Sequence, residues 1–231
     1  MQSQPQLQLP VQTGELSVAQ NRVLRNTYLM LSLTMIPTVI GAMIGMNLNF
    51  GIMRSNPIMS FVVILAVFYG MIYAIEKNKD SILGVGLLLG FTFLMGLLLA
   101  PLLQVALGLS NGGSIIAMAA AGTGAAFFGM AGVATVTKRD FSFMGKFLMV
   151  GVIVAMVAIV ANVFLQMPVM ALTISAVVVL ISAMLILYTI SGIIHGGETN
   201  YVSATLSLYI GVYNIFSGLV KLLMAFTGNR D

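Results

Sequence analysis

The feature that most constrains this chain is a series of seven long apolar runs separated by short polar connections. The hydrocarbon core of a bilayer is about 30 Å thick, and a helix that rises about 1.5 Å per residue crosses it with about 20 apolar residues. Runs of that length occupy residues 27–47, 57–75, 81–103, 114–136, 142–165, 168–193 and 202–226. The pattern predicts an all-α, polytopic membrane protein with seven transmembrane helices.

The composition supports the same fold class. Only 7% of the residues are charged and the mean hydropathy is +1.06, whereas about a quarter of the residues of a soluble domain are charged. We expect one bundle at residues 27–226, a flexible cytosolic tail at 1–26 and a short tail at 227–231. The first tail is polar, rich in Gln and contains Pro5 and Pro10, without the apolar core of a cleavable signal peptide.

The distribution of positive charge predicts the orientation in the membrane. Two groups of cations alternate with the apolar runs: Arg22, Arg25, Lys77, Lys79, Lys138, Arg139 and Lys146 on one side, and Arg54, Lys221 and Arg230 on the other. Cytoplasmic loops carry the excess of Lys and Arg, so we expect a cytoplasmic N-terminus and a periplasmic C-terminus. An uncleaved first helix fits a bacterial inner membrane or an organelle membrane. Lys221 lies near the end of the last run and is expected to extend to the interface.

Few residues of this chain could support catalysis, metal binding or nucleic-acid binding. Cys is absent, His195 is the only histidine, and the six acids lie in tails, loops or at helix ends. No metal-ligand spacing or cofactor-binding motif results, and ten Lys and Arg residues are too few for a nucleic-acid surface. We therefore expect no enzyme, no cofactor and no metal. Because Ser191 lies one turn before His195, an intramembrane Ser–His hydrolase is a third hypothesis.

Three of the glycine pairs spaced four residues apart lie within or at the end of an apolar run, where this spacing allows two membrane helices to approach closely. These pairs are Gly41 with Gly45, Gly86 with Gly90, and Gly192 with Gly196. We expect helix packing at all three.

Polar side chains gather near the end of the sequence, in the last loop and in the last two apolar runs. In lipid they need hydrogen-bonding partners, so the last helix is expected to face protein. A structural network and a path for a ligand or ion are both open interpretations. The candidate residues are Tyr188, Thr189, His195, Glu198, Asn200, Tyr201, Tyr209, Tyr213 and Asn214.

Four stretches of this sequence are similar to a known family. They read GGETNYVSATLSLYIGVYNIF at residues 196–216, VLRNTYLMLSLT at 23–34, KRDFSFMGKFLM at 138–149 and ANVFLQMP at 161–168. The chain resembles the Bax inhibitor family of seven-helix membrane proteins, and in particular its bacterial YccA-like branch. The resemblance implies six helices around a central seventh, a bacterial inner membrane, and association with the membrane-bound AAA protease FtsH and its HflK/HflC partners.

Members of that branch are described as both substrates and restraints of the protease. The resemblance therefore implies a modulator that is itself a slowly degraded client, with residues 1–22 as the segment that the protease grips. The wider family is associated with a calcium leak attributed to two aspartates. By this resemblance, Thr189 and Gly211 correspond to those positions, and neither exchanges a proton near neutral pH. An ion leak is the alternative function, and the two substitutions weaken it.

Overall fold

All the elements that the computed structural model describes are helices. It describes residues 13–49, 51, 55–137 and 139–228. The long helices are α1 (Thr13–Met46), α3 (Pro57–Lys77), α4 (Ile82–Leu107), α5 (Gly112–Thr137), α6 (Met144–Leu165), α7 (Pro168–Ile194) and α8 (Tyr201–Thr227). Each is long and apolar enough to cross a membrane. The prediction of an all-α, polytopic membrane protein with seven spanning helices is confirmed.

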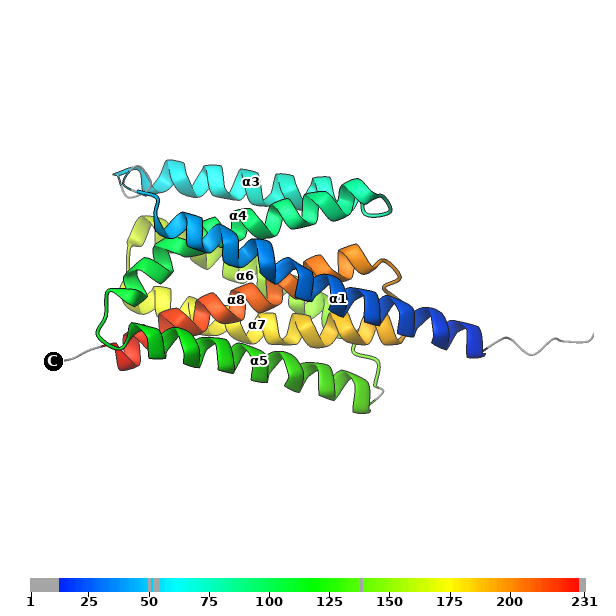
Figure 1. Ribbon diagram of the computed structural model, residues 1–231. Coiled ribbons are helices and arrows are strands. Elements are labelled where there is room, and N and C mark those ends of the chain that lie inside the picture. The colour runs from blue at the N-terminus through cyan, green and yellow to red at the C-terminus, as the bar shows by residue number, and fades with distance from the viewer. Residues whose placement is uncertain (1–12, 50, 52–54, 138, 229–231) are drawn as a thin grey trace, which may run out of the picture.

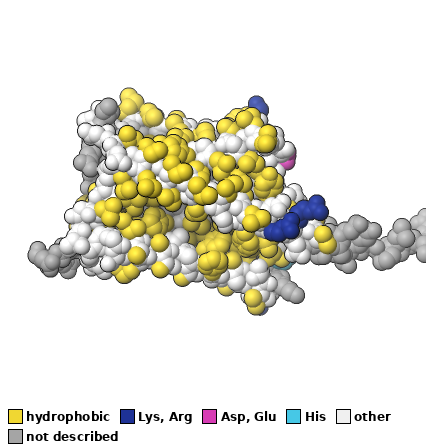
Figure 2. Space-filling view, viewed as in Figure 1, with side chains coloured by type: hydrophobic (Ala, Val, Ile, Leu, Met, Phe, Trp, Pro, Cys, Tyr) yellow, Lys and Arg dark blue, Asp and Glu magenta, His cyan; other side chains and the backbone are white. Residues whose placement is uncertain are grey.

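The helices run up and down in one bundle, with α1 and α8 starting at one end (Figure 1). We call this the N-terminal end; it also holds the loops at 78–81, 139–143 and 195–200. The opposite end, called the C-terminal end, holds the connections at 108–111 and 166–167. On the face seen in Figure 2, apolar side chains cover the middle of the bundle, and the coloured charges gather toward the N-terminal end.

The seventh spanning helix, α8, is the centre of the bundle. It packs against α1, α3, α4, α5 and α7, and its buried side chains include the largest in the core, Tyr209. The predicted central position of this helix is confirmed. In contrast, α6 packs against α7 and α3, and no Cα atom of α6 lies within 8 Å of a Cα atom of α8 in the described residues. The side of α8 that faces α6 is therefore not closely covered by α6.

The first helix begins earlier than the hydropathy predicts. The helix α1 starts at Thr13 rather than near residue 27, so the predicted tail is corrected at residues 13–26, which are helical. The stretch from Ala19 to Arg25 contains no Pro or Gly and several good helix formers, so the helix continues beyond the apolar run. Residues 1–12 and 229–231 of the two predicted tails lie outside the described residues.

Glycines bring the backbones of α1 and α4 into direct contact. A Cβ at Gly41 would overlap the carbonyl oxygen of Phe93, and a Cβ at Gly96 would overlap the carbonyl oxygen of Thr38. Gly45 lies against the Ala100 methyl group in the same crossing. The predicted packing role of Gly41 and Gly45 is therefore confirmed, with Gly96 of α4 as their partner.

The other two glycine pairs do not act as predicted. For Gly86 and Gly90, no atom of the described chain lies within 4 Å of an added Cβ, so both face the outside of α4. Gly192 and Gly196 end α7 instead of joining two helices: the Gly192 carbonyl accepts hydrogen bonds from the N–H groups that follow the helix, and Gly196 adopts a left-handed φ of 76°. Spacing alone does not show which face of a helix a glycine occupies.

Candidate functional site

Polar side chains at the N-terminal end join the loop between α3 and α4 to the start of α8. Asn200 is the N-cap of α8, where its Oδ1 accepts hydrogen bonds from the N–H groups of Val202 at 2.8 Å and Ser203 at 3.2 Å. Its Nδ2 donates to Asp80 Oδ1 at 2.7 Å and to the Lys79 carbonyl at 3.3 Å. One side chain thus starts the central helix and holds a loop more than a hundred residues away.

Glu76 makes the second connection in this group. The Ser203 hydroxyl of α8 donates to Glu76 Oε2 at 2.8 Å, and Lys79 Nζ donates to the same oxygen at 3.3 Å. This hydrogen bond to Glu76, followed by the charge of Glu76, raises the pKa of Lys79. Glu198 Oε1 accepts from the Asn200 N–H at 2.8 Å. We call these residues the cap cluster: Glu76, Lys79, Asp80, Glu198, Asn200 and Ser203.

The start of α1 lies against the loop between α7 and α8. A Cβ at Gly196 would lie 3.2 Å from Nε2 of Gln20, and the left-handed φ of Gly196 would strain any other residue there. In Figure 1 the first turns of α1 extend beyond the other helices at this end. At the N-terminal end, the first turns of α1 therefore project from the bundle, while Gln20 lies against the loop between α7 and α8.

Ser191 and His195 meet as the sequence spacing predicts, but the serine is engaged in holding a loop. Ser191 Oγ lies 3.4 Å from His195 Nδ1, accepts a hydrogen bond from the Phe141 N–H at 3.0 Å and donates to the Arg139 carbonyl at 3.3 Å. These contacts anchor the loop between α5 and α6 to α7. They give Ser191 a structural role that requires no catalysis.

In the same loop, the side-chain and backbone hydrogen bonds from Ser142 lower the pKa of Asp140. The carboxylate is therefore charged at neutral pH and fixes the turn that enters α6.

In the middle of the bundle, Tyr209 connects α8 to both helices of the glycine crossing. Its hydroxyl lies 2.8 Å from the hydroxyl of Thr38 on α1 and donates to the Thr92 carbonyl of α4 at 3.3 Å. The Tyr209 ring packs edge to face on Phe91. Because Tyr209 is buried and hydrogen-bonded to α1 and α4, it interrupts the row of polar side chains along α8 in the middle of the bundle.

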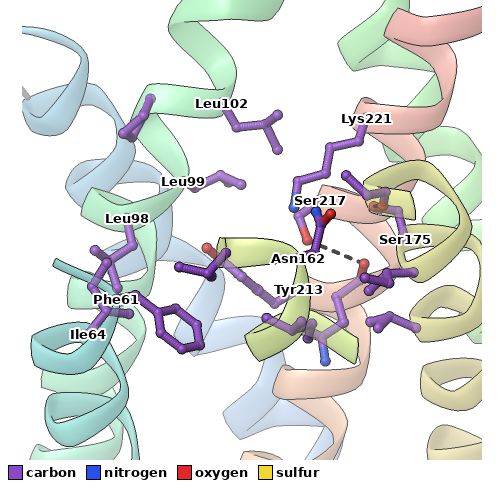
Figure 3. A pocket seen from close by; sticks show the side chains of 18 of the residues that line it. Phe61, Ile64, Leu98, Leu99, Leu102, Asn162, Ser175, Tyr213, Ser217 and Lys221 are labelled. Atoms are coloured by element: carbon purple, nitrogen blue, oxygen red, sulfur yellow. Dashed lines mark hydrogen bonds between the residues drawn. The ribbon is translucent and has the colours of Figure 1, made fainter. Parts of the chain in front are cut away.

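Toward the C-terminal end, the space between α6 and α8 is a cavity of about 900 Å³. Figure 3 shows it between α3 and α4 on one side and α6, α7 and α8 on the other. Tyr213 and Asn214 line its inner part, and Lys221 reaches into it from the outer part of α8. The sequence predicted that Lys221 extends to the interface; the structure adds that its side chain points into this cavity.

The nine predicted polar residues do not form one continuous network. Glu198 and Asn200 belong to the cap cluster, Tyr209 to the middle of the bundle, and Tyr213 and Asn214 to the cavity. His195 ends α7. The other three residues support packing: Tyr188 lies against Gly145 of α6, Thr189 is buried on α7, and Tyr201 packs at the edge of the main core.

Gly211, which the resemblance matches to the second aspartate, is a point of close helix contact. A Cβ there would lie 2.8 Å from Ile186 Cγ1 and 3.3 Å from the Ser182 carbonyl oxygen on α7. Thr189, at the first position, is 6% exposed. Neither position offers a carboxylate, and at Gly211 the packing leaves no room for one.

Comparison with known proteins agrees with this architecture. Residues 20–229 match the family described as inhibitor of apoptosis-promoting Bax1. An uncharacterized protein of Neisseria meningitidis serogroup B is 44% identical over 92% of this chain and 94% of its own length. A protein of Escherichia coli K12 named modulator of FtsH protease YccA is 40% identical over 89% of this chain and 91% of its own length. The chain belongs to the Bax inhibitor family of seven-helix membrane proteins.

Proposed function

We propose that this protein restrains an FtsH-type AAA protease of the bacterial inner membrane by occupying it as a slowly degraded client. The observation that carries the proposal is its similarity to the Escherichia coli protein named modulator of FtsH protease, which extends through the bundle rather than over one motif. A second relative, from Escherichia coli O6:H1, is named inner membrane protein YccA. The family and these names favour a modulator over an enzyme.

We propose that the N-terminal end faces the cytosol. The exposed Arg22, Arg25 and Lys77 lie there, and positive charge near the ends of membrane helices favours the cytosolic side. An AAA protease that works in the cytosol would then meet the projecting start of α1. The C-terminus would be periplasmic.

Extraction from the N-terminus would have to begin with α1. The predicted handle, residues 1–22, has two parts: residues 1–12 lie outside the described residues, and from Thr13 onward the chain is helical. Pulling on α1 separates Gly41 from the α4 backbone and breaks the contact between Thr38 and Tyr209. Because these contacts are broken before any other helix is released, they raise the barrier to extraction, and a slow client occupies the protease for longer.

The HflK/HflC proteins are proposed as further partners in the same complex, together with membrane lipid. Their contact surface would lie on the outer faces of the bundle, where large apolar side chains of α3 and α6 are exposed in the isolated chain.

The experiment compares the full chain with a version that lacks residues 1–12, which leaves every described helix intact. Both are co-purified with FtsH complex from membranes, and turnover of a client protein is followed in the same samples. We expect the full chain to bind and to slow client turnover, and the shortened chain to lose most of that effect. A version that lacks residues 229–231 is the control and should act like the full chain. Equal restraint by all three would contradict the proposal.

The ion-leak alternative has less support. The polar face of α8 is interrupted by Tyr209, which is bonded to α1 and α4, and Gly211 lies closed against α7. In proteoliposomes, an ion flux that falls when Asn214 is replaced by Ala would favour the leak over the modulator.

A further inference from the structure

The cavity between α6 and α8 is placed and lined to hold a lipid. Asn214 is the middle residue of α8, and Lys221 lies six residues before the end of that helix at Thr227, which corresponds to about 9 Å along its axis. The cavity therefore extends from near the C-terminal end to the middle of the bundle. This is the depth of one leaflet of a bilayer.

The wall that α3 and α4 form is almost entirely apolar, whereas the wall that α6, α7 and α8 form carries polar side chains among apolar ones. Phe61 and Ile64 of α3 face Leu98 and Leu102 of α4 in an apolar wall (Figure 3). On the opposite side are the polar groups of α6 and α8. An acyl chain fits the first wall, and a polar headgroup fits the second.

Among the described residues that line the cavity, Lys221 is the only charged one. Figure 3 shows its side chain reaching from α8 into the cavity, toward Ser217 and Asn162. No Asp or Glu lines the cavity, and Lys221 forms no ion pair or hydrogen bond with any residue in the described ranges. Lys221 is exposed in the isolated chain, so in a membrane it lies beside lipid, where a lysine ammonium attracts an anionic headgroup.

Two neighbouring side chains also lack protein partners. Neither Tyr213 nor Asn214 forms a side-chain hydrogen bond to another residue that the structure describes. Asn162 uses its Oδ1 to accept from the Met167 N–H at 3.1 Å, and its amide N–H groups donate to no acceptor among the described residues. Acceptors are what a phosphate and its ester oxygens provide.

We propose that this cavity binds one anionic phospholipid of the surrounding leaflet, with its phosphate on Lys221 and one acyl chain between α3, α4 and α6. The lack of close contact between α6 and α8 leaves the space that the chain fills. Charge complementarity selects an anionic over a zwitterionic headgroup, since a phosphate on Lys221 has no neighbouring acid to repel it. The site is separate from the cap cluster and from the proposed protease grip at the other end of the bundle.

The test uses the purified full chain in detergent, mixed with vesicles of phosphatidylglycerol or of phosphatidylcholine with the same acyl chains. The fraction of protein that retains one lipid is read by native mass spectrometry. We expect phosphatidylglycerol to be retained in preference to phosphatidylcholine. Lys221→Met should weaken that retention about fivefold, the effect of one lysine near an anionic lipid, whereas Lys221→Arg should keep it.

Matched variants distinguish binding in this cavity from non-specific binding of anionic lipid to the protein surface. Lys77→Met removes an exposed lysine at the other end of the bundle and should leave retention unchanged. Val163→Trp fills the cavity with Lys221 intact and should abolish retention, which keeps the test decisive if Lys221→Met does not fold. Equal retention of both lipids by the native chain, unchanged retention in Val163→Trp, or release of phosphatidylglycerol by inorganic phosphate alone would overturn the proposal.

Discussion

Helices α1 and α6 belong to the same bundle but are held in opposite ways. The helix α1 touches the backbone of α4 through glycines and is hydrogen-bonded to α8 at Thr38. The helix α6 packs only on α7 and α3 within the described residues and borders a cavity where it would meet the central helix. Resistance to extraction should therefore be concentrated in α1, α4 and α8, while the side near α6 can admit a lipid.

The strongest test of this difference changes one glycine on each side. Gly96→Ala places a methyl group on the Thr38 carbonyl oxygen of α1, where neither backbone can move without separating the helices. We expect a loss of about 3 kcal/mol in the free energy of unfolding, measured by denaturant titration in detergent micelles.

The matched change is Gly151→Ala on α6. Its Cβ would meet only the flexible end of Ile181 at 3.3 Å, and Ala favours the helix by about 0.5–1 kcal/mol over Gly. The free energy of unfolding should change by less than about 1 kcal/mol. A Gly151→Ala variant as unstable as Gly96→Ala would show that α6 is held as tightly as α1.

The cap cluster predicts the next largest effect. Asn200→Ala removes the N-cap of α8 and the bond to Asp80 together. A helix cap contributes about 1 kcal/mol and a hydrogen bond to a charged group about the same or more, so we expect a loss of about 2 kcal/mol. Asn200→Asp keeps the capping oxygen but repels Asp80, and a loss no smaller than that of Ala would identify the Asp80 contact as the more important one.

Two tyrosines one turn apart on α8 sharpen the comparison further. Tyr209→Phe removes a hydroxyl that contacts both α1 and α4 and should lower the free energy of unfolding by about 1 kcal/mol. Tyr213→Phe removes a hydroxyl that faces the cavity and should have almost no effect. The same denaturant titration compares them, and equal losses would contradict the division of α8 into a bonded part and a cavity-facing part.

The smallest effect is expected at the ion pair between Lys79 and Glu76, whose side chains are 37% and 38% exposed. Lys79→Met should cost less than about 1 kcal/mol at neutral pH. Glu76 raises the pKa of Lys79, so the pair stabilises the folded state below the ordinary lysine pKa of 10.5 and loses this contribution as the pH rises through the raised value. The native chain and Lys79→Met should therefore have nearly equal free energies of unfolding in strong alkali. A difference in stability that grows there would contradict this.

The spans could be predicted from the sequence because hydropathy is local. Hydropathy does not locate the start of α1, because helix-forming residues such as Ala19 and Arg25 continue the helix outside the apolar run. The partner of Gly41 and Gly45 was also missed: Gly96 has no glycine four residues away, and only the fold brings it to Thr38.

Only some residues of the candidate site were predicted: Glu198, Asn200 and Tyr209 were among the expected polar residues. The other members of these contacts were not among them: Glu76, Lys79, Asp80, Ser203 and Thr38. The predicted topology puts the loops near Asp80 and Asn200 at the same end, so their contact could be expected from the sequence. The division of the polar face of α8 could not, because residues 200 to 214 extend over about 20 Å and meet different helices along the way. The cavity depends on where α6 does not pack, which no pattern in α6 itself indicates.

The most direct test of the account measures client turnover by an FtsH complex in proteoliposomes that contain the native chain, Gly96→Ala or Gly151→Ala. If resistance to extraction is the source of restraint, Gly96→Ala will be degraded faster and will slow client turnover for a shorter time, while Gly151→Ala will act like the native chain. A Gly96→Ala protein that is less stable in micelles yet restrains the protease as long as the native chain would contradict the account.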